Sequence, residues 1–246
     1  MKPKMRLHHF LYLLIFSCIG FGQDFQKAYQ LQEDGKNNQA IKELKLLIDQ
    51  QPNNKKALSL AGEIYSKQEN WEEASNYYKK LVELEPKNAD YNFKYGGSLG
   101  LYAKSVNKFK AVFLVEDVKK YLNLAAELDP EHVEVRWALI QLYLELPSII
   151  GGSVEKAKQY AKELEKVSPV DGALTNGIIA EEEKDFSAAE NYYKNAIAIG
   201  NSKLTYQKLV ELYLKTDQLQ KAKEYAQKAY KETSEKQFLE QVRHIN

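Results

Sequence analysis

The sequence predicts an all-α protein built from repeated helix pairs, and two observations lead to this prediction. Helix breakers are sparse: the 246 residues include 12 Gly and 6 Pro, while 44 % are apolar and 28 % are charged. In addition, related segments recur along the chain. A helix pair of this size cannot bury its apolar face alone, so repeated pairs are expected to stack into one continuous core.

The clearest internal repeat joins residues 70–80 to residues 185–195. In both segments an aromatic residue is followed three positions later by Ala, and then by a Tyr pair. Pro52 and Pro86 each follow a helical pattern and lie 34 residues apart. A fixed period of this length is typical of stacked helical repeats.

The second unit shows the pattern most completely. Its apolar residues fall on one face of each helix, namely Leu58, Ala61, Gly62 and Tyr65 on the first and Ala74, Tyr78 and Leu81 on the second. Gly62 and Ala74 are small where the two helices must approach closely, and Pro86 ends the second helix because proline lacks the N–H that a helix needs. This arrangement resembles a tetratricopeptide repeat. The resemblance implies a right-handed α-solenoid whose concave face is formed by the first helices.

The same register accounts for nearly the whole chain. We expect a signal peptide at residues 1–22 and one solenoid domain at 23–246, with about six helix pairs and a short C-terminal helix. The predicted units are about 24–54, 55–88, 89–132, 133–169, 170–202 and 203–234, followed by the terminal helix at 235–246.

Two units are longer than the period. Pro86 and Pro130 lie 44 residues apart, and Pro130 and Pro169 lie 39 apart, so the third and fourth units carry insertions between their helices. We expect longer helices in the third unit, and a loop followed by a Ser153 N-cap in the fourth. Two interpretations stay open. The insertions thicken the core around the apolar helix at about 132–146, or they wall a pocket for an apolar ligand.

The N-terminus is typical of a secretory signal peptide. Three basic residues precede an apolar run at 10–16, and small residues precede a Gly22–Gln23 junction. The run is too short to span a bilayer, which takes roughly 20 apolar residues. The sequence therefore predicts an exported protein of the periplasm or cell envelope with no transmembrane span in the mature chain. The alternative is an outer-membrane lipoprotein acylated at Cys18, the single cysteine.

Several kinds of chemistry are not expected. Without the three basic residues of 1–22 the chain holds 32 basic and 34 acidic residues, so it lacks the basic excess that a sequence-independent grip on nucleic acid needs. The mature chain has only His132 and His244 and no Cys, which argues against a metal site. We find no pairing of nucleophile and base, and therefore expect no cofactor and no enzymatic activity.

We expect the chain to bind a protein or peptide in its concave groove. By register, the candidate groove residues are Ser59, Glu63, Phe93, Gly97, Trp137 and Gln141. This row has no Lys–Asn pair of the kind with which chaperone-tail tetratricopeptide domains grip a C-terminal carboxylate, so such a clamp is not expected. The alternative function is a carrier that encloses a lipid-like or other apolar small molecule under the insertion of the third repeat. Residues 129–157 also resemble exported tetratricopeptide proteins of Bacteroidota-type bacteria.

Overall fold

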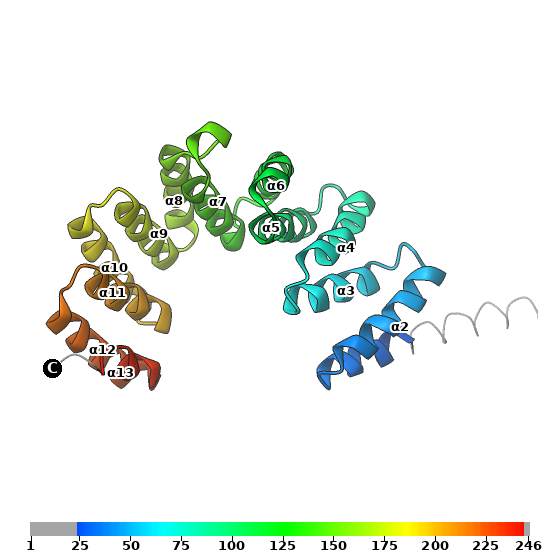
Figure 1. Ribbon diagram of the computed structural model, residues 1–246. Coiled ribbons are helices and arrows are strands. Elements are labelled where there is room, and N and C mark those ends of the chain that lie inside the picture. Colours follow the sequence, from blue (N-terminus) through cyan, green and yellow to red (C-terminus); the bar gives the residue numbers. More distant parts are fainter. Residues whose placement is uncertain (1–23, 244–246) are drawn as a thin grey trace, which may run out of the picture. The chain divides into compact units, whose positions relative to one another are not determined.

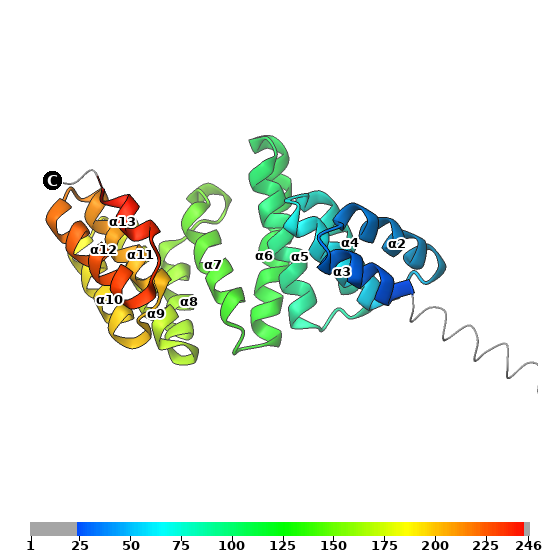
Figure 2. The ribbon, with the colours of Figure 1, turned by 90° about the horizontal axis from the view of Figure 1, so that it is seen from below.

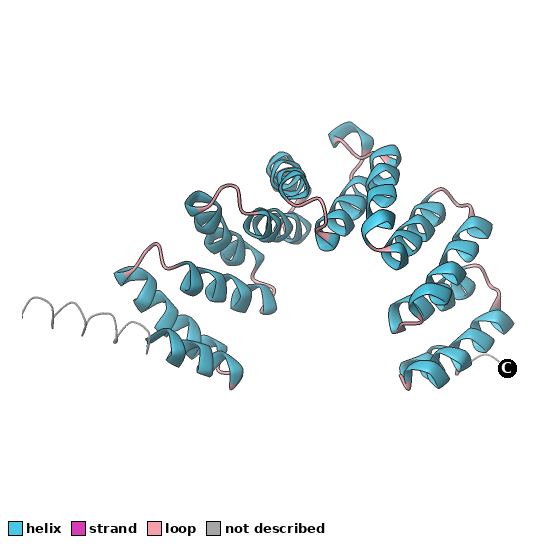
Figure 3. Cartoon of the chain, turned by 180° about the vertical axis from the view of Figure 1, so that it is seen from behind, coloured by secondary structure: helices cyan, strands magenta, loops and turns pink. Residues whose placement is uncertain are grey.

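The computed structural model describes residues 24–243, and the elements within this range are helices joined by short loops (Figure 3). The predicted signal peptide, Cys18 and His244 lie outside the described residues. The chain divides into two compact units, the first ending at Leu128 and the second beginning at Asp129.

Unit 1 contains three helix pairs, in which each helix packs against the next along the chain (Figure 1). Its helices are 24–33, α2 (Asn37–Gln50), α3 (Lys55–Lys67), α4 (Trp71–Leu84), α5 (Ala89–Ser105) and α6 (Lys108–Leu128). The core is formed by the predicted faces, because Leu58, Ala61, Ala74 and Leu81 have no exposed surface.

Unit 2 contains three further pairs and a terminal helix. Its elements are α7 (Val133–Glu145), the 3-10 turn η1 (Ser148–Ile150), α8 (Val154–Val167), α9 (Pro169–Glu182), α10 (Phe186–Gly200), α11 (Lys203–Lys215), α12 (Leu219–Thr233) and α13 (Gln237–Gln241). The short α13 buries Phe238 against the last pair. The predicted all-α class of repeated helix pairs is confirmed.

The turn inside a regular pair has a fixed geometry. One residue in it adopts a positive φ, at Gly35, Glu69, Lys184 and Asp217, with values between 57° and 74°. In two of these four pairs a side chain then caps the second helix: Asn70 accepts from the backbone N–H of Glu73, and Asp185 accepts from that of Ala188. The cap satisfies a backbone donor that has no partner within the helix. The second helices α2 and α12 have no side-chain cap.

In the α3–α4 and α9–α10 pairs, the two helices come together at a glycine that faces a tyrosine. A Cβ added to Gly62 would lie 2.5 Å from Cε1 of Tyr78, and one added to Gly177 would lie 2.2 Å from Cε1 of Tyr193. The tyrosine hydroxyl then reaches the first helix again, where Tyr193 donates to Glu181 at 2.6 Å and Tyr78 lies 3.4 Å from the Ser66 hydroxyl. The predicted close approach at Gly62 is therefore confirmed.

The third pair lacks the regular turn. Its inserted residues lengthen the helices as expected, to 17 residues in α5 and 21 in α6. The two helices pack closely from Gly96, where an added Cβ would lie 3.1 Å from the Leu122 backbone nitrogen, and an extended residue, Val106, joins them. The expectation that the insertion thickens the core is wrong for its aromatic residues, because Phe109 and Phe113 are exposed.

The insertion of the fourth pair forms a tight turn. Residues 148–150 make one 3-10 turn, and Gly151 follows with a φ of 103°. Ser153 caps α8 through a hydrogen bond from the Lys156 backbone, which confirms the predicted N-cap. Ile149 is 92 % exposed, so this side chain neither thickens the core nor encloses a pocket.

Alanine substitutions at the helix glycines should separate the two kinds of position. We expect Gly62→Ala and Gly177→Ala to lower the free energy of unfolding by about 1–3 kcal/mol each, because the new methyl group would collide with a tyrosine ring. A Cβ at Gly97 meets nothing within 4 Å, so Gly97→Ala should raise that free energy by up to ~1 kcal/mol through helix propensity alone. Urea denaturation followed by circular dichroism measures each change. Equal effects at the three glycines would contradict the proposed packing.

Candidate functional site

Side chains about one repeat apart connect the first helices of successive pairs. In unit 1 the Lys94 amine on α5 lies 3.3 Å from a Glu63 oxygen on α3. In unit 2 the indole N–H of Trp137 on α7 donates to Asp171 on α9 at 2.9 Å, and Lys215 on α11 donates to Glu181 on α9 at 2.9 Å. Within each unit, equivalent positions of neighbouring first helices therefore lie side by side.

One such connection belongs to a group that we call the α3–α5 cluster, consisting of Ser59, Glu63, Asp90 and Lys94. The Ser59 hydroxyl donates to Glu63 at 3.0 Å, and Lys94 also pairs with Asp90 at 3.2 Å. The side chains remain accessible, with exposed fractions of 27 % for Lys94, 45 % for Glu63 and 53 % for Asp90. The cluster therefore offers one cation, two carboxylates and a hydroxyl at the surface.

Neighbouring carboxylates favour the protonated, charged form of the Lys94 amine. Partial burial acts to lower the pKa of its amine, but the carboxylates of Asp90 and Glu63 outweigh this effect and raise the pKa above its ordinary value. Lys94 is accordingly a cation at neutral pH, and it is already matched by two carboxylates. The arrangement differs from a site built to bind a free carboxylate, which needs positive charge that is not neutralised by neighbours.

The surface beside Lys94 is open. Phe93 precedes it on α5 and is half-buried, and Gly97 follows three residues later. The space into which a Gly97 side chain would project is empty out to 4 Å. Gly97, one of the predicted groove residues, therefore leaves room for another molecule to approach the α5 backbone.

The other two predicted groove residues lie on α7 in unit 2. Trp137 is partly buried against the core of that unit, and its N–H is occupied by Asp171, which also accepts a hydrogen bond from Ser168 at 2.5 Å. Gln141 is exposed one turn further along the helix. The six predicted residues thus form two groups, four on α3 and α5 and two on α7.

Asp90, Lys94 and Asp171 are not among the residues predicted from helical register. Lys94 contacts Glu63 and Asp90, and Asp171 contacts Trp137, so these side chains complete polar contacts around predicted positions. One signal was present in the sequence: Glu63 and Lys94 have opposite charge and lie close to one repeat apart. Such pairs become recognisable only when the register of successive first helices is known.

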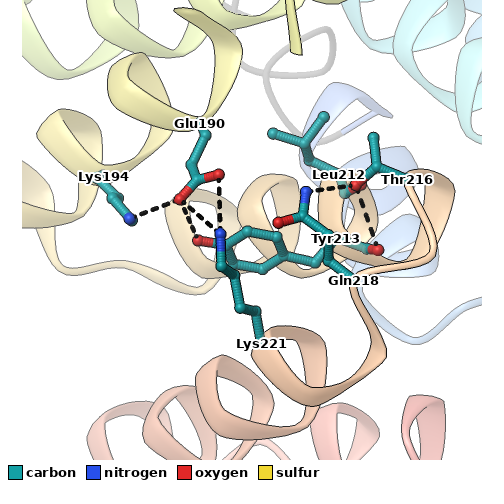
Figure 4. A network of polar contacts seen from close by, with 7 residues as sticks. All are labelled: Glu190, Lys194, Leu212, Tyr213, Thr216, Gln218 and Lys221. Carbon is teal, nitrogen blue, oxygen red and sulfur yellow. Dashed lines mark hydrogen bonds and ion pairs between the residues drawn. The ribbon is translucent and has the colours of Figure 1, made fainter. Parts of the chain in front are cut away.

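A second polar network connects the helices of unit 2, and Figure 4 shows three side chains converging on Glu190 of α10. Lys194 donates to it at 2.6 Å, Tyr213 at 3.0 Å and Lys221 at 3.4 Å. Burial acts to raise the pKa of Glu190, yet the hydrogen bonds from Lys194 and Tyr213 hold this pKa below its ordinary value. Because its donors come from α10, α11 and α12, the network serves to hold these helices together.

Among residues 24–243, no three His, Cys, Asp or Glu side chains are grouped so that they could hold a metal ion. Over the same range, no helix is both long enough and apolar enough to cross a bilayer.

Comparison with known proteins identifies the repeats. Family models described as tetratricopeptide repeat match residues 31–92 and residues 205–235. These two segments are tetratricopeptide repeats. The first segment lies in unit 1 and includes α3 and α4. The second lies in unit 2 and includes most of α11 together with α12. A search of curated proteins finds no match to the chain.

Solved structures extend the likeness to the fold of nearly the whole chain. A tetratricopeptide repeat protein from Parabacteroides merdae has a TM-score of 0.68 at 19 % identity, covering 91 % of this chain and 84 % of that one. A thermophilic protein of this kind from Thermus thermophilus has a TM-score of 0.60 at 14 % identity, covering 79 % and 99 %. YrrB, described as having an unusual peptide-binding site, has a TM-score of 0.54 at 18 % identity, covering 74 % and 87 %. The fold is that of tetratricopeptide repeats.

The hydrogen bond of Trp137 can be tested by a conservative substitution. Trp137→Phe keeps an aromatic ring but leaves Asp171 without the indole donor, so the free energy of unfolding should fall by about 1–2 kcal/mol. Trp71→Phe is the control, because the indole N–H of Trp71 has no hydrogen-bond partner among the described residues. Thermal and urea unfolding measure both changes. An equal loss in the two variants would show that the bond to Asp171 contributes nothing.

The buried tyrosines predict how stability depends on pH. Burial raises the pKa of Tyr95 from 10.0 to about 12, and the pKa of Tyr193 is raised by burial and by its hydrogen bond to Glu181. The unfolded chain ionises at the lower pKa, so the stabilisation is complete below pH 10 and is lost as the pH rises towards about 12. Urea unfolding across this window should show the decline, and Tyr95→Phe should make it shallower. An unchanged pH profile in Tyr95→Phe would contradict this assignment.

Proposed function

We propose that the chain is an exported, non-catalytic scaffold that binds an extended segment of a protein or peptide along the first helices of its repeats. The observation that supports this most directly is the accessible α3–α5 cluster beside the open surface at Gly97. Tetratricopeptide repeats generally serve as scaffolds for protein interaction. The peptide-binding site described for YrrB is a property of that protein, and it makes a peptide ligand a reasonable choice here.

The chemistry of the cluster suits a peptide backbone. An extended segment presents N–H donors and C=O acceptors that are not paired with each other. Glu63 and Asp90 can accept from the N–H groups, and Lys94 can donate to a C=O group. Phe93 adds apolar contact beside them. The formal charge of the cluster is −1, which favours a neutral or basic segment over a free C-terminal carboxylate.

Unit 2 offers a second contact surface. Gln141 is exposed on α7, and its amide can pair with either group of a peptide bond. Trp137 presents the part of its ring that the core of unit 2 leaves uncovered. Its fixed orientation suits an anchor residue, because a ring already held by Asp171 loses little freedom on binding. The envelope location rests on the N-terminal pattern, and N-terminal sequencing of the protein from its natural source would test cleavage at Gly22–Gln23.

The partner site can be tested by filling the open surface. Gly97→Tyr should reduce capture of the partner at least ~tenfold, because the ring occupies space that is empty in the free protein. Gly100→Ala is the matched control, since its added methyl group meets only Val118, at an ordinary 3.5 Å. Partners are captured from the envelope fraction of the source organism, quantified by mass spectrometry and then titrated as purified proteins.

Glu63→Gln provides a second arm, because it removes the charge but keeps the shape of the side chain. Glu63→Gln should weaken binding of the captured partner, as Gly97→Tyr does, and should leave the helicity of the chain intact. The proposal is rejected if a partner captured by the unsubstituted chain binds the Gly97→Tyr and Glu63→Gln variants equally well.

A further inference from the structure

Helix α6 begins with an exposed apolar face, which we call the α6 tip and which consists of Phe109, Val112 and Phe113. Their exposed fractions are 78 %, 46 % and 70 %. Spacings of three and four residues place them on one side of the helix. The two phenyl rings pack edge to face with their centroids 5.2 Å apart, so they form one apolar knob.

The tip is distinct from the face by which α6 packs on α5. That face carries Val115, Val118 and Leu122, which are buried. The knob therefore contributes nothing to the core of the α5–α6 pair, and the fold of unit 1 does not explain it. Figure 2 shows the end of this long hairpin extending beyond the ends of α2, α3 and α4.

The beginning of α6 is well fixed. The Asn107 side chain accepts from the Lys110 backbone N–H at 3.0 Å and so caps the helix. The Lys110 amine hydrogen-bonds to the Tyr102 hydroxyl on α5 and lies 3.7 Å from a Glu72 oxygen on α4. These contacts hold the two phenyl groups in a defined position away from the rest of unit 1.

Lysines outnumber acids around the tip. Residues 104–113 contain Lys104, Lys108 and Lys110 and no Asp or Glu, while Glu72 of α4 lies 3.7 Å from the Lys110 amine. Lys104 and Lys108 are exposed close to the phenyl groups in sequence. Glu116, the first acid after this stretch, is paired with Lys119 at 2.5 Å. An apolar knob with lysines beside it is complementary to a surface that is negatively charged outside and apolar beneath.

We propose that the α6 tip inserts into the headgroup region of a lipid bilayer that contains anionic lipids. Aromatic and aliphatic side chains enter the boundary between headgroups and acyl chains, while lysines are attracted to anionic headgroups. A projecting knob needs no preformed pocket in a fluid bilayer, whereas a protein partner would need one. A second copy of the chain fits poorly, since it would bring the same lysines together.

Flotation with lipid vesicles tests this proposal. The full chain should bind vesicles of phosphatidylcholine mixed with phosphatidylglycerol more tightly than vesicles of phosphatidylcholine alone. The double variant Phe109→Ser, Phe113→Ser should lose at least ~tenfold in binding, because it removes the groups that enter the bilayer. Lys108→Glu should weaken binding to the anionic vesicles selectively, and added salt should do the same.

The control replaces two apolar residues of unit 2 that are also exposed, Ile199 at 50 % and Leu204 at 42 %. The double variant Ile199→Ser, Leu204→Ser should bind vesicles like the unsubstituted chain. All variants share the apolar run at residues 10–16, so differences between them report on the tip. Circular dichroism confirms that helicity is retained, as expected for changes at exposed positions.

The depth to which the α6 tip enters the bilayer is measured separately with brominated lipids, which quench the fluorescence of tryptophan within the bilayer. Phe113→Trp should add fluorescence that anionic brominated vesicles quench, and Ile199→Trp should add fluorescence that they do not. The proposal is overturned if the unsubstituted chain ignores anionic vesicles, if the Phe109→Ser, Phe113→Ser variant binds them equally well, or if the tryptophan at 113 stays unquenched. It is also overturned if sedimentation shows instead that the phenyl groups hold two copies of the chain together.

Discussion

The packing of a tyrosine ring against a helix glycine is the constraint on which the α3–α4 and α9–α10 pairs depend. At Gly62 and Gly177 a single methyl group would overlap the ring of Tyr78 or Tyr193, so the two helices can lie this close only because the glycine has no side chain. Close packing also brings the tyrosine hydroxyl back to the first helix, where Tyr193 donates to Glu181. Glu181 in turn accepts from Lys215 of the following pair, so packing within one pair positions a contact with the next.

These contacts between pairs explain how a repeat presents a binding surface. Neighbouring first helices are held in register by side chains about one repeat apart, as in the pair formed by Glu63 and Lys94. The same contact that joins α3 to α5 leaves both side chains partly exposed beside Gly97. The α3–α5 cluster therefore joins two helices and also forms the surface that we propose binds a partner, whereas Glu190 is mostly buried and serves to join helices.

The third pair differs from the regular pairs because it lacks the turn with a positive-φ residue. Gly35 and Glu69 adopt a positive φ and reverse the chain at once, but α5 continues to Ser105 and α6 begins at Lys108. The added length carries Phe109 and Phe113 past the helices that would otherwise cover them. The proposed peptide surface and the proposed membrane contact thus lie on different parts of unit 1. The proposed peptide surface consists of residues in the regular register of the repeat. The proposed membrane contact consists of residues in the insertion of the third pair.

The sequence by itself determined the local structure and the packing inside each pair. The recurrence of small and aromatic residues at fixed spacing predicts a close helix approach at Gly62, and the excess of residues over the period predicts longer helices in the third pair. These features are local, because helix propensity, capping and periodicity act over a few residues. The helical register also selected Gly97 as a candidate groove residue.

Only the tertiary structure decided which side chains of different helices meet. Asp90 and Lys94 were not selected from the sequence, because a contact between α3 and α5 depends on the rotation and offset of two stacked helices. The environment of Trp137 was decided in the same way, by Asp171 on α9. The apolar run at the beginning of α6 is equally compatible with a core and with an exposed tip in sequence alone. Its exposure depends on where the neighbouring helices end, and that is a property of the folded chain.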